Sequence, residues 1–198
     1  FFTPIAIFLI GILSVYSASY KMNQPLNDML ALRQLLWKSA AILVVFLVIR
    51  WNYFKLMDLA WPFYFLSLFF LLAVLFMPAR LGAHRWIDLG GFNFQPSEVA
   101  KLAMILVLAR FFSNHRPEFI SRGRLFMPFL IVGVPFLLIL KEPDLGTGLV
   151  LIPIFLSMLY VWGFSPRALL ILIGSGLLIS PLFFHFLKEY QQARLLVF

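Results

Sequence analysis

Charged residues that could do chemistry gather in one stretch, GAHRWIDLGGFNFQPSEVAK at residues 82–101. This stretch holds Arg85 and Lys101, whose cationic groups suit phosphate, and Glu98, in a chain where only 12% of residues are charged. A second charged stretch, KEPDLGTG at residues 141–148, contains Asp144. Carboxylates suit sugar hydroxyls or a divalent cation. Together the two stretches would suit a ligand with phosphate and hydroxyl groups.

The local sequence predicts that the first stretch leads into a helix. Pro96 favours an extended approach, Ser97 is expected to cap the helix, and Glu98 falls in the first turn, where the helix dipole favours an anion. Lys101 follows Glu98 by three positions, so their side chains can meet on one helix face. Arg85 is expected to fold back towards this pair across the loop.

The second stretch predicts the end of one helix and the start of the next. Pro143 would end the first helix and Asp144 would cap the second, while Gly146 and Gly148 keep the backbone accessible. In the first stretch, Trp86 is expected to anchor the loop in the lipid headgroup layer. Both stretches fall on the same predicted face, which favours a polar cavity that opens outward.

A simpler interpretation of these charges stays open. An ion pair such as Glu98 and Lys101, one turn inside a membrane span, costs little because its groups reach water. Asp144 is equally explained as an ordinary helix cap. In that case the charges stabilise helix ends and bind nothing.

The composition is that of a membrane protein. Of the 198 residues, 63% are hydrophobic and 24 are phenylalanine, and the mean hydropathy is +0.97. We therefore predict an all-α integral membrane protein, a polytopic helical bundle that occupies residues 1–198 as a single membrane domain. About seven transmembrane spans are expected, at Phe1–Ser19, Leu35–Ile49, Leu59–Met77, Val99–Phe112, Leu125–Leu140, Leu145–Gly163 and Ala168–Leu187.

Two of these spans need comment. The first is apolar but lacks the cationic start and cleavage site of a signal peptide, so we interpret it as a retained span. Val99–Phe112 is short, and a half-helix packed inside the bundle is the alternative.

The charge distribution predicts the partners and the orientation. The net charge is +8, and because the cations lie in short loops and at span ends, anionic membrane lipids are the expected partner and nucleic acid is not. Loops dense in arginine and lysine mark one side as cytoplasmic, namely the side that carries Arg50, Lys55, Arg110, Arg116, Arg122, Arg124 and Arg167. Both charged stretches then lie on the outer side.

Several chemistries are not supported by the sequence. There is no cysteine, no Gly-rich nucleotide-binding loop and no HExxH or GxSxG motif. His84, His115 and His185 lie at three separate places, so no metal site is predicted from them. No cofactor is predicted, although the acids would suit a divalent cation.

The run GAHRWIDLGGFNFQPSEVAKLAMILVLARFF, followed by EPDLGTGLVL, resembles the SEDS family of shape, elongation, division and sporulation proteins. The likeness extends to YSAS at residues 16–19 and KEYQQARLLVF at 188–198. The FQPSE loop favours the elongation branch, RodA, over the division branch, FtsW.

The resemblance implies an inner-membrane peptidoglycan glycosyltransferase of about ten spans, which polymerises lipid II into glycan strands outside the cytoplasmic membrane with a class B penicillin-binding protein. It makes this chain the N-terminal portion of a longer protein, inactive alone, because the family's catalytic aspartate is expected in a large extracellular loop beyond Phe198. The residues that match the family's conserved positions are Arg85, Trp86, Glu98, Lys101 and Asp144.

Two other functions stay open at this point. A flippase for lipid-linked precursors would also use an outward polar cavity, but it should carry a polar path across the bundle, and polar residues in the middle of the spans are few. A non-catalytic scaffold for a penicillin-binding protein would leave Arg85 and Asp144 as structural residues only.

Overall fold

The computed structural model describes residues 10–11, 13–14, 17, 27–77, 85–88, 93–115, 122–184 and 192. Most of these residues are α-helical, in agreement with the predicted all-α fold. The chain divides into two compact units, Phe1–Tyr53 and Phe54–Phe198. Most of the predicted span Phe1–Ser19, as well as His84, His185 and nearly all of residues 188–198, lies outside the described residues. The single membrane domain stays a prediction.

The first unit contains one long helix, α2, at Asn27–Arg50. It includes the predicted span Leu35–Ile49 but begins earlier, because the preceding residues NDMLALRQ are mostly good helix formers. Its 24 residues give a length of about 36 Å. From Leu35 onward nearly every side chain is exposed. Most of these exposed side chains are apolar.

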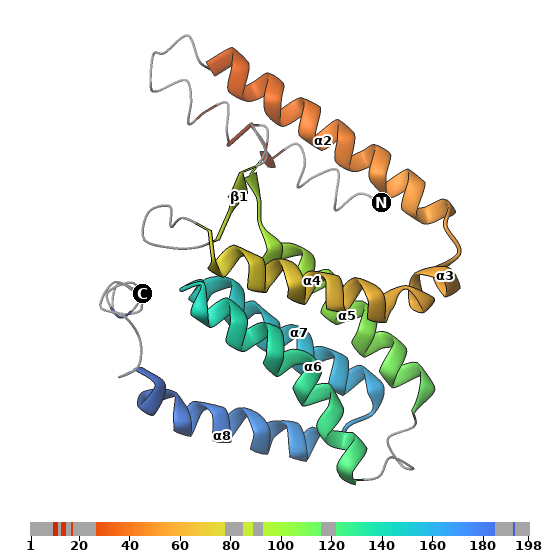
Figure 1. Ribbon diagram of the computed structural model, residues 1–198, viewed down its shortest axis with the longest axis vertical. Helices are drawn as coiled ribbons and strands as arrows, with labels where there is room; N and C mark the ends of the chain where they lie inside the picture. Colours follow the sequence, from red (N-terminus) through yellow and green to blue (C-terminus); the bar gives the residue numbers. More distant parts are fainter. Residues whose placement is uncertain are drawn as a thin grey trace. The chain divides into compact units, whose positions relative to one another are not determined.

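The second unit is a bundle of helices (Figure 1). After the short α3 at Tyr53–Asp58, which the sequence did not predict, it contains α4 (Ala60–Leu75), α5 (Pro96–Asn114), α6 (Arg122–Lys141), α7 (Leu145–Trp162) and α8 (Pro166–Phe184). These helices match the predicted spans to within a few residues. By length and composition alone, α7 qualifies as membrane-spanning among the described helices, and shorter apolar helices lie at Ala60–Leu75, Phe126–Lys141 and Pro166–Ile179.

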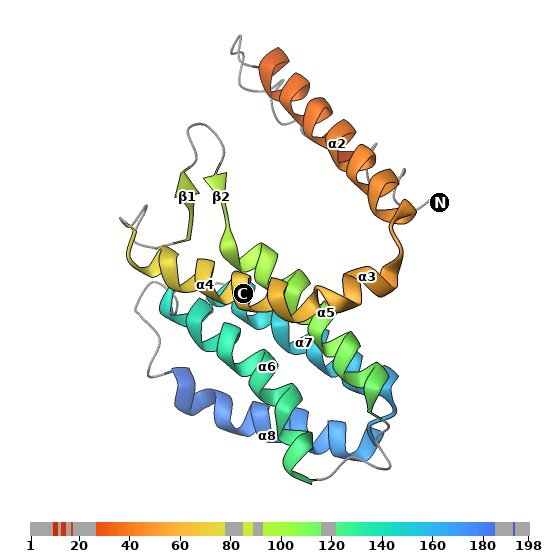
Figure 2. The ribbon, with the colours of Figure 1, turned by 45° about the vertical axis from the view of Figure 1, so that its right-hand side comes forward.

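Helix α5 is central to the bundle and packs against α4, α6 and α7 (Figure 2). It is a continuous helix of 19 residues, about 28 Å long, rather than a half-helix. Its buried positions repeat every three to four residues, as expected for a helix that buries one side, and are Pro96, Ser97, Ala100, Ala103, Met104, Val107, Leu108, Phe111 and Phe112. The core of the unit therefore forms around α5.

A buried hydrogen bond joins α4 to α6. Pro135 lies inside α6 and has no N–H to donate to the carbonyl of Ile131, four residues earlier. The hydroxyl of Tyr64 donates to that carbonyl instead, at 2.9 Å. A proline inside α6 thus provides an acceptor for a side chain of α4.

Candidate functional site

Part of the first charged stretch forms a β-hairpin, which comes directly before α5 in the sequence. Strand β1 (Ile87–Asp88) pairs antiparallel with β2 (Asn93–Phe94), with Ile87 opposite Phe94 and Asp88 opposite Asn93 (Figure 2). The prediction of a loop in the headgroup layer did not include this hairpin. The sequence did contain a signal for this hairpin, because alternating apolar and polar residues flank a Gly-Gly pair.

Helix α5 begins two residues earlier than its predicted cap allows. The N-cap is Gln95 and Pro96 occupies the first helical turn, so the prediction of Ser97 as the cap is wrong. The physical reason is that proline needs no N–H partner and its φ is already helical, which favours the first helical position. Ser97 is instead buried. The prediction that Glu98 lies in the first turn is confirmed.

Asp144 caps α7, as predicted. Its carboxylate accepts hydrogen bonds from the backbone N–H of Thr147 at 3.5 Å and from the Thr147 hydroxyl at 2.7 Å. The side-chain amide of Gln95 also donates to Asp144, at 3.1 Å, and contacts the hydroxyl of Ser97 at 3.0 Å. Asp144 is only 6% exposed. Its carboxylate therefore joins the start of α5 to the start of α7.

Arg85 lies against the same turn. Its Nη1 is 3.8 Å from Oδ1 of Asp144, and its Nη2 donates to the carbonyl of Pro143. The Arg85 side chain therefore contacts both the carboxylate of Asp144 and the backbone carbonyl of the residue before it.

Glu98 and Lys101 form a separate pair. Nζ of Lys101 donates to Oε1 of Glu98 at 2.8 Å, as the spacing predicted, and the Glu98 side chain is 56% exposed. In the described part of the chain, no hydrogen bond or ion pair joins this pair to Arg85 or Asp144. Arg85 therefore turns to the α6–α7 turn, whereas the sequence placed it towards Glu98. The remaining predicted residue, Trp86, is 42% exposed.

Glu142 is the residue that the sequence reasoning missed. It is fully buried, and within the described structure neither carboxyl oxygen has a hydrogen-bond partner. Burial, and after it the negative charge of Asp144, raise the pKa of Glu142 to about 8 against the opposing effect of Arg85. The KEPD sequence shows an acid beside a helix end, where most acids are solvated, and burial cannot be read from it.

The arrangement suits recognition of an anion better than binding of a metal. Among the described residues no three His, Cys, Asp or Glu side chains gather around a common point. Both oxygens of Asp144 are already used by Thr147, Gln95 and Arg85. The Arg85 side chain as a whole is 23% exposed, so part of it can be reached from the surface. A guanidinium fixed by a buried carboxylate is well suited to phosphate.

Comparison with known proteins shows the family to which this chain belongs. The family described as "Cell cycle protein", with the model name FTSW_RODA_SPOVE, matches residues 1–198. The chain belongs to this family. It is 37% identical over 165 residues to Stage V sporulation protein E of Bacillus subtilis, an alignment that covers 78% of this chain and 44% of that protein. It is 32% identical over 206 residues to a probable peptidoglycan glycosyltransferase FtsW of Geobacter sulfurreducens, covering 98% and 54%.

Solved structures show the same fold. The crystal structure of the rod shape determining protein RodA of Thermus thermophilus has a TM-score of 0.72 and 31% identity, covering 88% of this chain and 56% of RodA. A structure described as "Structural coordination of polymerization and crosslinking by a peptidoglycan synthase complex" has a TM-score of 0.72 and 30% identity, covering 96% and 57%. The resemblance to SEDS proteins is thereby confirmed. This family member, a membrane protein, spans about half the length of these relatives.

Proposed function

We propose that the protein to which this chain belongs is a peptidoglycan glycosyltransferase of the bacterial inner membrane. It would polymerise lipid II into glycan strands at the outer face, in cell-wall elongation. The observation that carries the proposal is the contact of Arg85 with Asp144, found in a chain 32% identical over 98% of its length to a probable peptidoglycan glycosyltransferase.

The chemistry assigns a role to each charged residue. The acceptor hydroxyl attacks the anomeric carbon of the donor sugar, the bond from that carbon to pyrophosphate breaks, and a carboxylate takes the hydroxyl proton. Arg85 and Lys101 stabilise the charge on the departing pyrophosphate. Asp144 orients Arg85, and Glu98 holds Lys101.

An open hollow on the surface of α6 would fit part of a lipid-linked substrate. It has a volume of about 490 Å³ and is lined by Val134, Leu137, Leu138, Leu140 and Lys141. The apolar part suits a polyprenyl tail, and the cation at its end suits the phosphate that follows such a tail. Lys141 directly precedes the turn that Arg85 contacts. Tail and pyrophosphate would therefore meet where α6 ends.

The partner we propose is a class B penicillin-binding protein. The structural neighbour described as a peptidoglycan synthase complex coordinates polymerization with crosslinking, and crosslinking needs a second catalytic protein. We assign the same type of assembly to this protein. The elongation branch is favoured by the FQPSE loop and by the fold likeness to RodA.

The test is reconstitution of the full-length protein with its partner in vesicles that contain labelled lipid II. Glycan strands that a muramidase digests support the glycosyltransferase. Label that crosses the vesicle without strand formation overturns it in favour of a flippase. If neither occurs while the partner still binds, the protein is a scaffold.

A further inference from the structure

A buried carboxyl group, to which no described residue donates a hydrogen bond, lies two residues before Asp144, the partner of Arg85. Glu142 is 0% exposed, and neither of its oxygens is hydrogen-bonded in the described structure. Its backbone N–H is used at the end of α6, where it donates to the carbonyls of Leu138 and Ile139 at 3.2 and 3.1 Å. The backbone of Glu142 is therefore fixed, while its side chain is enclosed without a hydrogen-bond partner among the described residues.

Such a group is far more stable as a neutral acid than as an anion. A buried carboxylate without donors loses its hydration and gains nothing in return. Asp144, two residues away, already carries the negative charge that neutralises Arg85. A second negative charge in the same turn would repel the first.

Arg85, which contacts the same turn, has one donor that is unused among the described residues. Nε of Arg85 is buried and has no acceptor among the described residues, although Nη1 and Nη2 are engaged by Asp144 and Pro143. If Glu142 lost its proton, its carboxylate would compete with Asp144 for the positive charge of Arg85, which already acts on Glu142. Arg85 would then be shared between two carboxylates.

We propose that Glu142 is a positioning residue, which holds a proton at neutral pH and thereby leaves the guanidinium of Arg85 to Asp144 and the Pro143 carbonyl. With Glu142 neutral, the charges of Arg85 and Asp144 cancel, and a phosphate can approach the partly exposed Arg85 side chain. With Glu142 ionised, the turn carries a net negative charge that repels phosphate. The consequence for substrate binding rests on the proposed function, but the protonation itself does not.

The neighbouring charges agree with this assignment. The electric field at Glu142 comes from Asp144 and Arg85, and burial keeps its pKa near 8 despite the attraction of Arg85. The other described ionisable side chains on α4 to α7 are Tyr64, Glu98, Lys101, Arg110, Lys141 and Tyr160. Of these, Glu98 and Lys101 pair with each other.

The pH dependence has a definite sign. The pKa of Glu142 is raised in the folded protein, so the folded state binds the proton more tightly than the unfolded state. Stability is then greatest below the unfolded pKa of 4.5 and falls as pH rises towards about 8. Above that value the contribution is lost.

The experiment compares the full-length protein with Glu142→Gln, which keeps the shape and removes the titration, and with Asp58→Asn, which removes an exposed acid outside the site. Melting temperatures are measured in detergent between about pH 5 and pH 9. We expect the melting temperature of the wild type to fall relative to Glu142→Gln by on the order of 5 °C across this range. Asp58→Asn should follow the wild type. Parallel curves for wild type and Glu142→Gln would overturn the proposal.

A second measurement needs no substitution that might unfold the protein. Infrared titration of the wild type should show a protonated carboxyl band at neutral pH that disappears near the pKa of about 8, because exposed acids are ionised by then. Absence of that band at neutral pH overturns the proposal. Neither readout involves lipid II, so the protonation of Glu142 is decided even if the proposed function fails.

Polymerisation kinetics test the consequence for the site. If the proposed function holds, the KM of the wild type for lipid II should rise several-fold between about pH 7 and pH 9, whereas that of Glu142→Gln should change less. Identical KM profiles in proteins that do polymerise lipid II would overturn the positioning role.

Discussion

Two arginines make similar contacts near opposite ends of α5. Arg85 donates to the carbonyl of Pro143 and lies 3.8 Å from Asp144. Arg110, near the end of α5, donates to the carbonyl of Met57 and lies 3.4 Å from Asp58. The partners differ, because the side chain of Asp144 is 8% exposed and that of Asp58 is 78% exposed.

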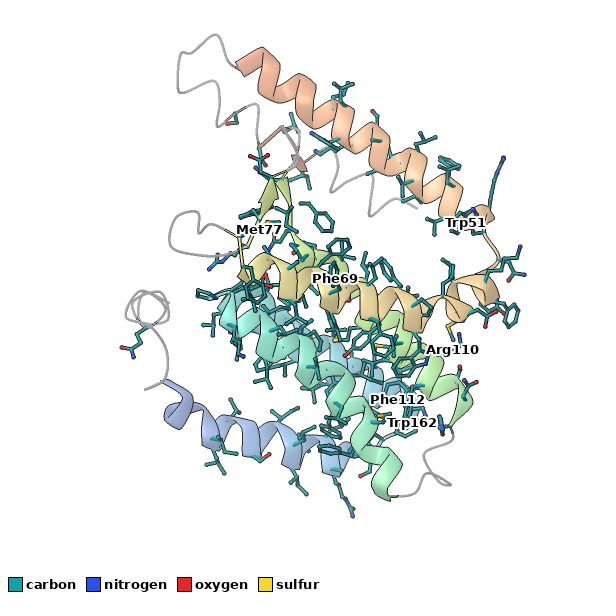
Figure 3. All side chains as sticks on the ribbon, viewed as in Figure 1. Trp51, Phe69, Met77, Arg110, Phe112 and Trp162 are labelled. Carbon is teal, nitrogen blue, oxygen red and sulfur yellow. The ribbon has the colours of Figure 1, made fainter. Side chains whose placement is uncertain are left out.

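The surroundings of the two arginines also differ. Close to Arg110, the indole N–H of Trp162 donates to the carbonyl of His115 at 2.7 Å, and its ring stacks on Phe112 with centroids 4.6 Å apart (Figure 3). Polar groups there have partners. Near Arg85, the carboxyl of Glu142 and the Nε of Arg85 itself have none among the described residues. Buried polar groups without partners are costly and mark places where function outweighs stability.

The largest difference should appear in activity. Arg85→Ala in the full-length protein is expected to lower the rate of lipid II polymerisation about 100-fold, because a donor aimed at the developing charge is removed. Arg110→Ala should stay within about tenfold of the wild type, since its contacts only hold helix ends together. The measurement is a polymerisation assay on both variants. Melting temperatures show that each variant is folded. Equal losses of polymerisation rate in the two variants would show that Arg85 and Arg110 do not differ in function.

Substitution of Asp144 and of Asp58 should lower the free energy of unfolding by different amounts. Asp144→Ala is expected to lower the free energy of unfolding by about 2–3 kcal/mol, because it removes a helix cap and leaves the partly buried Arg85 without its counter-charge. Asp58→Ala should cost less than about 1 kcal/mol, as exposed ion pairs do. Denaturant unfolding in detergent measures both. Asp144→Asn is the matched control, since an amide keeps the cap.

The sequence alone does not distinguish the two ends of α5, because the difference between them depends on contacts between distant residues. Hydropathy located the helices of the second unit, and spacing correctly paired Glu98 with Lys101, because both are local properties. The contact of Arg85 with Asp144 joins residues 59 positions apart in sequence order, counted from 85 to 144, and no local pattern encodes it. The burial of Glu142 depends equally on how α6 and α7 pack. For this reason the sequence wrongly predicted that Arg85 would lie towards Glu98 and Lys101, which are nearer to it in the sequence.

A buried polar contact in the middle of the bundle provides a reference for both ends. Tyr64→Phe is expected to cost about 1–2 kcal/mol, because it leaves the carbonyl of Ile131 without a donor. In a Pro135→Ala background the backbone N–H of residue 135 can take over, so the cost of Tyr64→Phe should fall to less than half. A double-mutant cycle measures this coupling. An unchanged cost would mean that Pro135 does not create the acceptor.

The smallest effect concerns Glu98 and Lys101, which pair on α5 three positions apart and of which Glu98 is largely exposed. Their side chains are 56% and 21% exposed, so a double-mutant cycle on unfolding should give a coupling of about 0.3–0.5 kcal/mol. Our hypothesis that Glu98 chiefly holds Lys101 also requires coupling in the polymerisation rate, with Glu98→Gln adding little once Lys101→Ala is present. Zero coupling in both measurements would remove that hypothesis. A coupling in stability as large as that of a buried pair would instead mean that Glu98 and Lys101 are enclosed with ligand-binding groups, and that the site extends from the α6–α7 turn onto the face of α5.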